Sequence, residues 1–121
     1  MTADLDKSTD VLYTGQKYRL EKTEIFANWF ERLSDTVGRA RISKRLVRAA
    51  EGQFGDCKSV GDGVFEMRMF FGPGYRVYYM LKGDVVVVLL AGGNKDSQFR
   101  DIAKAKELAL KVGNDTGDDA I

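Results

Sequence analysis

The fold is decided by the stretch from Val64 to Leu90, which reads VFEMRMFFGPGYRVYYMLKGDVVVVLL. Two of its segments, 64–71 and 75–81, alternate between the two faces of an extended chain, a period of two that is typical of half-buried strands. A third segment, 85–90, is apolar on both faces and is expected to be a buried central strand. Because tight turns rich in glycine separate the segments, the stretch predicts three antiparallel strands in a meander.

Helical patterns flank this meander on both sides. A first helix is expected over 23–33, with the Thr23 hydroxyl as its N-cap, and a second from about Thr36 to Ala50. A final helix, capped by Asp96 or Ser97, is expected to continue to about Val112. The residues of the second helix that we expect to point inward are Val37, Ala40, Leu46 and Val47.

These elements predict an α+β domain. Its sheet is expected to be small and antiparallel, a short N-terminal strand over 18–20 plus the three-stranded meander, packed with two N-terminal helices and a C-terminal helix. The length of 121 residues suits one domain, which we place at 15–112. The two ends, 1–14 and 113–121, are acidic, rich in Asp, Thr and Gly, and expected to be disordered.

The formal charge of +1 conceals a basic body between these acidic ends. Residues 17–112 carry 18 Lys and Arg against 12 Asp and Glu, whereas 1–16 carry one against three and 113–121 carry none against three. A basic body attracts polyanions, which favours nucleic acid as a partner. Basic residues concentrate on the second helix, where an ordinary solvated surface and an RNA or protein contact are both open interpretations. This basic helix face consists of Arg39, Arg41, Lys44, Arg45 and Arg48.

The composition points to a soluble protein of the cytoplasm. Apolar residues make up 44% of the chain, and the longest apolar run, Val85–Ala91, is far too short to cross a bilayer, so no membrane contact is expected. The first residues lack the basic and apolar segments of a secretory signal. The single cysteine, Cys57, forms no internal disulfide and, in a chain without histidine, is interpreted as a packed or surface thiol.

One face of the predicted hairpin gathers side chains that carry chemistry. The alternation places Glu66 and Arg68 of one strand on the same face as Arg76 and Tyr78 of the next, and we expect an exposed concavity there. Lys95 follows the central strand in a glycine-rich loop from which it can reach that face. A set of cross-strand salt bridges is the alternative interpretation. The opposite, buried face is expected to hold Phe65, Met67, Met69, Phe71, Val77, Tyr79 and Leu81.

Several stretches, taken together, match the pattern of one family. They are 64–80, 85–98 and 101–106, with the helix over 23–33 and the connection 52–58. In these stretches the chain resembles the phage-derived, HigB-like "addiction module killer" branch of the RelE/ParE superfamily. The resemblance implies a RelE-like fold and the toxin of a type II toxin–antitoxin system, an endoribonuclease that cuts mRNA, commonly on the translating ribosome, and so inhibits translation. It also implies a HigA-like helix-turn-helix antitoxin as the protein partner. Contact with operator DNA is then expected only indirectly, through this antitoxin.

The resemblance also implies roles for individual residues. The arginine of the family's Gly-Tyr-Arg strand falls on Arg76, the basic position of the preceding strand on Arg68, and the basic loop residue before the last helix on Lys95. We expect the two arginines to hold the phosphate and Lys95 to protonate the leaving oxygen. Glu66 is the leading candidate base, although some relatives have a lysine there or use a histidine that this chain lacks. Tyr78 is a weaker candidate, as proton carrier or base-stacking platform.

The reaction expected from these residues is independent of metal and of any cofactor. The chain has no histidine, and its only cluster of carboxylates, Asp115, Asp118 and Asp119, lies in the C-terminal tail. The RNA's own 2′-hydroxyl is then the expected nucleophile. Two other functions share the fold and stay open: a non-enzymatic, ParE-like inhibitor of DNA gyrase, and an inactive regulatory relative.

Overall fold

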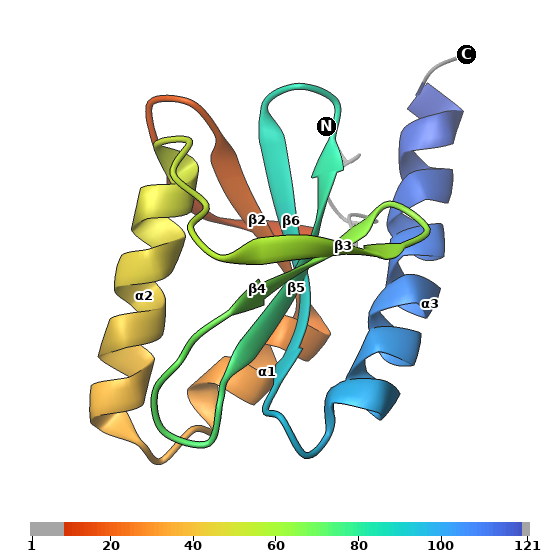
Figure 1. Ribbon diagram of the computed structural model, residues 1–121. Helices are drawn as coiled ribbons and strands as arrows, with labels where there is room; N and C mark the ends of the chain where they lie inside the picture. Colours follow the sequence, from red (N-terminus) through yellow and green to blue (C-terminus); the bar gives the residue numbers. More distant parts are fainter. Residues whose placement is uncertain (1–8, 120–121) are drawn as a thin grey trace.

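The computed structural model describes the backbone of residues 9–119 and the side chains of residues 9–113, in which six strands form one sheet that is packed by three helices (Figure 1). The helices expected over 23–33 and 36–50 are confirmed as α1 and α2. The elements in chain order are β1 (Thr9–Thr14), β2 (Arg19–Thr23), α1 (Glu24–Glu31), α2 (Thr36–Ala50), β3 (Cys57–Gly61), β4 (Val64–Arg68), β5 (Arg76–Lys82), β6 (Val86–Gly93) and α3 (Gln98–Asp119).

The sheet has the strand order β1-β2-β6-β5-β4-β3. The meander of β4, β5 and β6 is confirmed, and all of its pairs are antiparallel. The expectation of a wholly antiparallel sheet is wrong, because β2 pairs with β6 in parallel. Strand β6 is apolar on both faces and buried, so it needs a partner on each edge, and β2 takes the edge that β5 leaves open.

Two strands were not predicted. Strand β1 lies in the segment 1–14 that was expected to be disordered, and residues 9–14 instead pair with β2. The Thr9 hydroxyl donates a hydrogen bond of 2.7 Å to the buried Glu21 carboxylate, an anchor that the alternation of apolar residues does not reveal. Strand β3 pairs with β4 through a turn in which Asp62 has a positive φ of 57°. Residues 1–8 lie outside the described part of the chain.

The last helix is longer than expected. It continues past Val112 to Asp119, so residues 113–119 are helical, whereas disorder was expected for 113–121; residues 120–121 lie outside the described part. In the described residues, no helix has a stretch apolar and long enough to span a bilayer.

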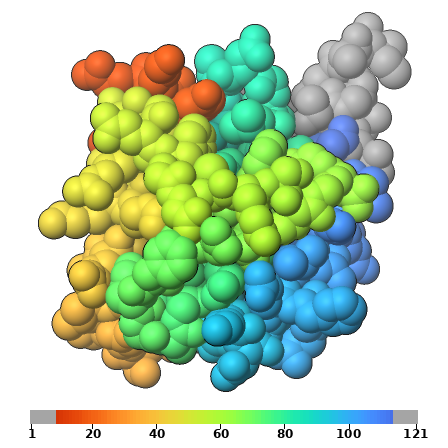
Figure 2. All heavy atoms as spheres, in the orientation of Figure 1, coloured from red at the N-terminus to blue at the C-terminus, as the bar shows by residue number. Residues whose placement is uncertain are grey.

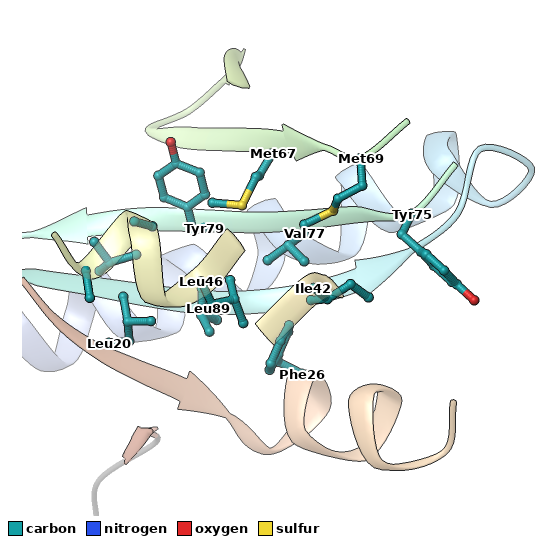
Figure 3. Close-up of a cluster of buried hydrophobic side chains, with 13 residues drawn as sticks. Leu20, Phe26, Ile42, Leu46, Met67, Met69, Tyr75, Val77, Tyr79 and Leu89 are labelled. Atoms are coloured by element: carbon teal, nitrogen blue, oxygen red, sulfur yellow. The ribbon is translucent and has the colours of Figure 1, made fainter. Parts of the chain in front are cut away.

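The two faces of the sheet carry separate hydrophobic clusters. Helices α1 and α2 cover one face, where Phe26, Ile42 and Leu46 pack on the strands (Figure 3). Helix α3 covers the other face with Ala105 and Leu108, and Figure 1 shows α2 and α3 on opposite sides of the sheet. Among the predicted core residues of the hairpin, Met67, Met69, Val77 and Tyr79 are buried, Phe65 and Phe71 are half-buried, and Leu81 is exposed.

The inward face of α2 differs from the predicted one. Leu46 is buried as expected, but Val37 is 68% exposed, and Ala40 and Val47 are also exposed. Gly38 permits this rotation of the helix, because a Cβ there would clash with the Asp35 carboxylate and would lie 2.9 Å from the Tyr75 ring of the hairpin. The residues of α2 that face the sheet are therefore Gly38, Ile42, Leu46, Ala49 and Ala50.

Candidate functional site

The register of the β4–β5 hairpin sets the geometry of the site. Arg68 lies opposite Arg76, and Glu66 lies opposite Tyr78, as the alternation predicted. The expectation that all four side chains are exposed is wrong, because helix α3 packs on this face of the sheet. Glu66 and Tyr78 are fully buried, whereas Arg68 and Arg76 retain contact with solvent.

Glu66 is the centre of a buried polar network. Its Oε2 accepts hydrogen bonds from the Tyr78 hydroxyl at 3.1 Å and from Nε2 of Gln98, in the first turn of α3, at 2.7 Å. The same oxygen lies 3.6 Å from Nε of Arg76. A buried carboxylate is costly unless it is paired, so this network ties strand β5 and the start of α3 to one anionic group.

Arg76 is held from two sides. Its Nε faces the Glu66 carboxylate, and its Nη1 donates a hydrogen bond of 2.8 Å to the Gly74 carbonyl. Only 11% of the side chain is exposed. Within the described residues, Nε of Arg76 and Oε1 of Glu66 are buried without a hydrogen-bond partner. The 3.6 Å from Nε to the other carboxylate oxygen, Oε2, is too long for a hydrogen bond. The guanidinium is thus oriented by the protein.

Burial sets the protonation state of Tyr78. Its removal from water raises the pKa of the phenol, and the nearby Glu66 charge raises it further. The hydroxyl therefore keeps its proton at neutral pH and donates a hydrogen bond to the Glu66 carboxylate. In this position Tyr78 has no exposed ring face on which a nucleobase could stack, which corrects that part of its predicted role.

Three cations converge on one hollow next to the hairpin. Arg68 comes from the end of β4, Arg76 from the start of β5, and Lys95 from the loop after β6. The loop that carries Lys95 is joined to the hairpin turn by a hydrogen bond of 3.4 Å from the Lys95 amide to the Pro73 carbonyl. We call this space, of about 410 Å³, the hairpin hollow; it is lined by Arg68, Met69, Phe70, Phe71, Gly72, Pro73, Gly74, Arg76 and Lys95.

The three cations differ in how far their charge is already compensated. Arg68 forms a two-pronged ion pair with Asp56, with both distances at 3.2 Å. Arg76 faces the buried Glu66. Lys95 is exposed, and no ion pair to it occurs among residues 9–113. None of the described residues that line the hollow is acidic, so an incoming anion meets only positive charge on its walls.

The predicted basic helix face is only partly a surface. Arg45 is half-buried and donates hydrogen bonds to the carbonyls of Arg68, at 2.8 Å, and Phe54, at 3.1 Å. Arg39 is half-buried as well. Arg48 is exposed, while Arg41 and Lys44 are exposed along a shallow depression on α2.

The exposed part of this helix face adjoins the hairpin hollow. The Arg41 guanidinium lies over the ring of Phe71, 4.6 Å from its centroid, and Phe71 lines the hollow. Figure 2 shows the hairpin turn at the surface between α2 and the start of α3. A strip of positive charge thus leads from α2 to the hollow.

Three residues of this arrangement were not among the predicted site residues. Asp56 and Gln98 contact the site only because β3 and α3 pack beside the hairpin, which no local pattern indicates. Phe70 lies at the hollow and is 78% exposed. The alternation does place Phe70 on the same strand face as Glu66 and Arg68, and this pattern could have identified it. The alternation alone, however, does not show which residues of that face are exposed and which are covered by a helix.

No protein-family model matches the chain. An uncharacterized protein of Haemophilus influenzae is 43% identical over 95 residues, which cover 78% of this chain and 96% of that protein. Among solved structures, a mutant of the E. coli toxin RelE in its free state matches with a TM-score of 0.58 and 24% sequence identity, over 74% of this chain and 97% of that one. The predicted RelE-like fold is therefore confirmed.

Proposed function

Because this chain belongs to the same family as the uncharacterized Haemophilus influenzae protein and has a RelE-like fold, we propose that it is the toxin of a type II toxin–antitoxin system. The proposed activity is that of a HigB-like mRNA endoribonuclease that inhibits translation in the cytoplasm. The observation that carries the proposal is the convergence of Arg68, Arg76 and Lys95 on the hairpin hollow. Three cations around an open hollow suit RNA, whose backbone carries a negative charge at every phosphate.

The proposed reaction uses the 2′-hydroxyl of the RNA as its nucleophile. Its oxygen attacks the adjacent phosphorus, the bond from phosphorus to the 5′ oxygen breaks, and the products are a 2′,3′-cyclic phosphate and a 5′-hydroxyl. Negative charge builds up on the phosphate oxygens during the attack. Arg76 and Arg68 meet that charge with planar, permanently protonated donors, and the protein thereby supplies the positive charge that a metal ion provides in other nucleases.

Two proton transfers complete the reaction. Lys95 donates a proton to the leaving 5′ oxygen, a role that suits an exposed ammonium group on the wall of the hollow. The proton of the 2′-hydroxyl passes to water on the open side, since no carboxylate is among the described residues that line the hollow. In this mechanism, most of the rate enhancement comes from the three cations, which stabilise the negative charge that develops on the phosphate in the transition state.

The burial of Glu66 favours a different role from that of a base. Its carboxylate is enclosed by Tyr78, Gln98 and Arg76, and none of its surface reaches solvent. We assign Glu66 to hold the guanidinium of Arg76 toward the hollow, and Tyr78 to hold Glu66. Both act as positioning residues behind the phosphate site.

The proposed partners follow from the same surface. A HigA-like helix-turn-helix antitoxin would cover the cations of the hollow and of α2 with acidic side chains, and would provide the link to operator DNA. Message bound to the ribosome is the proposed substrate. Expression of this chain without its antitoxin is expected to stop growth, whereas growth equal to that of cells with an empty vector would contradict a toxin function.

The proposed activity is tested with the purified chain and ribosome-bound message. Mapping of the RNA ends should reveal cuts within the message, and the same cuts should be lost with Arg76→Lys, which keeps a positive charge but removes the planar donors. A parallel assay of DNA gyrase supercoiling covers the alternative function. Intact message together with inhibited gyrase would contradict the proposal and favour a ParE-like inhibitor, and inactivity in both assays would favour an inactive relative.

A further inference from the structure

Phe70 stands out among the exposed apolar side chains because of its surroundings. Phe70 is 78% exposed, although its neighbour Met69 is buried in the core. It lies on the wall of the hairpin hollow together with Arg76 and Lys95, and the Arg68 guanidinium lies 5.8 Å from the centre of its ring. Single exposed apolar residues are common on protein surfaces, but this aromatic ring is grouped with three cations.

An exposed aromatic ring beside phosphate-binding cations is the arrangement that suits unpaired nucleic acid. In a single strand the bases are free to turn outward, and each presents a flat π-face that stacks on an aromatic side chain, while cations hold the backbone. In a duplex the bases are stacked on each other and hidden from such a ring. A hollow of about 410 Å³ is in the usual range of pockets that hold a small molecule.

We propose that Phe70 stacks on the base of an unpaired nucleotide whose phosphate lies between Arg68, Arg76 and Lys95. This inference rests on the proposed function, which makes RNA the ligand. It adds that the RNA must be unpaired where it binds the hairpin hollow. Because all four bases have a π-face, Phe70 contributes affinity with little base preference. In this proposal the bound RNA strand runs from Phe70 past Phe71 toward Arg41, whose guanidinium lies over the Phe71 ring.

The test is a binding measurement with an RNA analogue that cannot be cut. A short 2′-O-methyl oligonucleotide, alone or annealed to its complement, is titrated with the parent chain, Phe70→Ala, Phe70→Trp and Phe99→Ala, and binding is followed by fluorescence anisotropy. Phe99 is the matched control, since it is 92% exposed and does not line the hollow. The melting temperature of each variant is measured to confirm folding, which an exposed side chain should affect little.

The expected result is a loss specific to one variant and to the single strand. Phe70→Ala should bind the single strand roughly 5- to 150-fold more weakly than the parent, the range measured for loss of one stacked base. Phe70→Trp should keep the affinity of the parent, because an indole also stacks on a base. The fluorescence of the introduced indole should be quenched on binding. Phe99→Ala should bind as the parent does, and the duplex should bind the parent and Phe70→Ala equally.

Parent-like binding by Phe70→Ala, or no binding of the single strand by the parent, would overturn the inference. Equal losses in Phe70→Ala and Phe99→Ala would also overturn it, because a general apolar effect would then explain them. The analogue cannot be cleaved, so the result is independent of the proposed activity. If the parent cuts message but Phe70→Ala binds the analogue as tightly as the parent, the proposed activity stands and the stacking role fails. If the parent does not cut message but Phe70→Ala binds more weakly, the stacking role stands and the proposed activity fails.

Discussion

Glu66 and Arg76 face each other across 3.6 Å in the interior of the protein, behind the hairpin hollow. If Glu66 holds Arg76, Glu66→Gln keeps an oxygen that accepts from Tyr78 and Gln98 but loses the charge that faces the guanidinium. We expect RNA cleavage to slow by about tenfold or less, with the shape of the pH–rate profile unchanged. A general base typically contributes a hundredfold to ten-thousandfold. A loss of that size, accompanied by loss of the acidic limb of the profile, would make Glu66 the base.

Removal of Arg76 has two consequences that can be separated. Arg76→Ala leaves the Glu66 carboxylate buried without its cation, and breaking a buried pair in this way typically costs about 3–5 kcal/mol of unfolding free energy. The double variant Arg76→Ala/Glu66→Gln should recover most of this stability in urea denaturation. Cleavage should remain roughly a hundredfold to a thousandfold below the parent in both variants. Recovery of activity in the double variant would show that Arg76 acts only through the fold.

The residues on the site face were predictable from the sequence, but their environments were not. The period of two places Arg68 with Arg76 and Glu66 with Tyr78, and the hairpin register confirms both pairs. Whether that face is open depends on α3, which follows in the chain and packs back on the sheet. The amphipathic pattern of α3 indicates an apolar side without indicating which strands it covers.

Asp35 joins two elements, because it caps α2 and also contacts the hairpin. Its carboxylate accepts a hydrogen bond of 2.8 Å from the Gly38 amide and another of 2.8 Å from the Tyr75 hydroxyl. These bonds, that of the Gly38 amide first, hold the pKa of the Asp35 carboxyl below its usual value of 3.8. The stabilisation is therefore complete above the unfolded-state pKa and is lost as pH falls through the lower folded-state pKa.

Asp35→Ala is accordingly expected to unfold at a lower urea concentration than the parent at pH 7. The difference between the two should shrink below about pH 4, where the carboxyl starts to protonate in the unfolded chain. Asp10→Ala serves as the control, since Asp10 is exposed on β1 and no hydrogen bond of its side chain occurs among the described residues. A difference that persists unchanged to pH 2 would contradict the role of the Asp35 charge.

At the level of elements, long and regular apolar patterns were sufficient to predict helices and strands, whereas short segments gave no usable pattern. The cap at Thr23 and the meander were predictable, because each is encoded by neighbouring residues; the Thr23 hydroxyl accepts from the Phe26 amide at 3.1 Å. Strands β1 and β3 were missed, because they are edge strands held by pairing with β2 and β4 rather than by apolar alternation. The predicted inward face of α2 was wrong because the helix brings Gly38 close to Tyr75, which is 37 positions away in the sequence.

At the scale of the whole molecule, five cations lie along one route from α2 to the hairpin hollow: Arg41, Lys44, Arg68, Arg76 and Lys95. For single-stranded RNA each phosphate contact contributes about −0.7 to the slope of log affinity against log salt concentration, so five such cations predict a slope of about −3.5. Arg41→Ala and Lys44→Ala should each reduce the steepness by about 0.7. Lys111→Ala, on α3, should leave the slope unchanged, and an equal change in all three variants would contradict a defined route.

In the proposed reaction, cations of the hairpin hollow, and no metal ion, promote attack by the RNA's own 2′-hydroxyl. The most direct measurement is the chemistry of the new RNA ends after cleavage in excess EDTA. This mechanism predicts full cleavage, upstream fragments that end in a 2′,3′-cyclic phosphate or its 3′-phosphate hydrolysis product, and downstream fragments that begin with a 5′-hydroxyl. Cleavage that stops with EDTA, or upstream fragments that end in free 3′-hydroxyls, would contradict it.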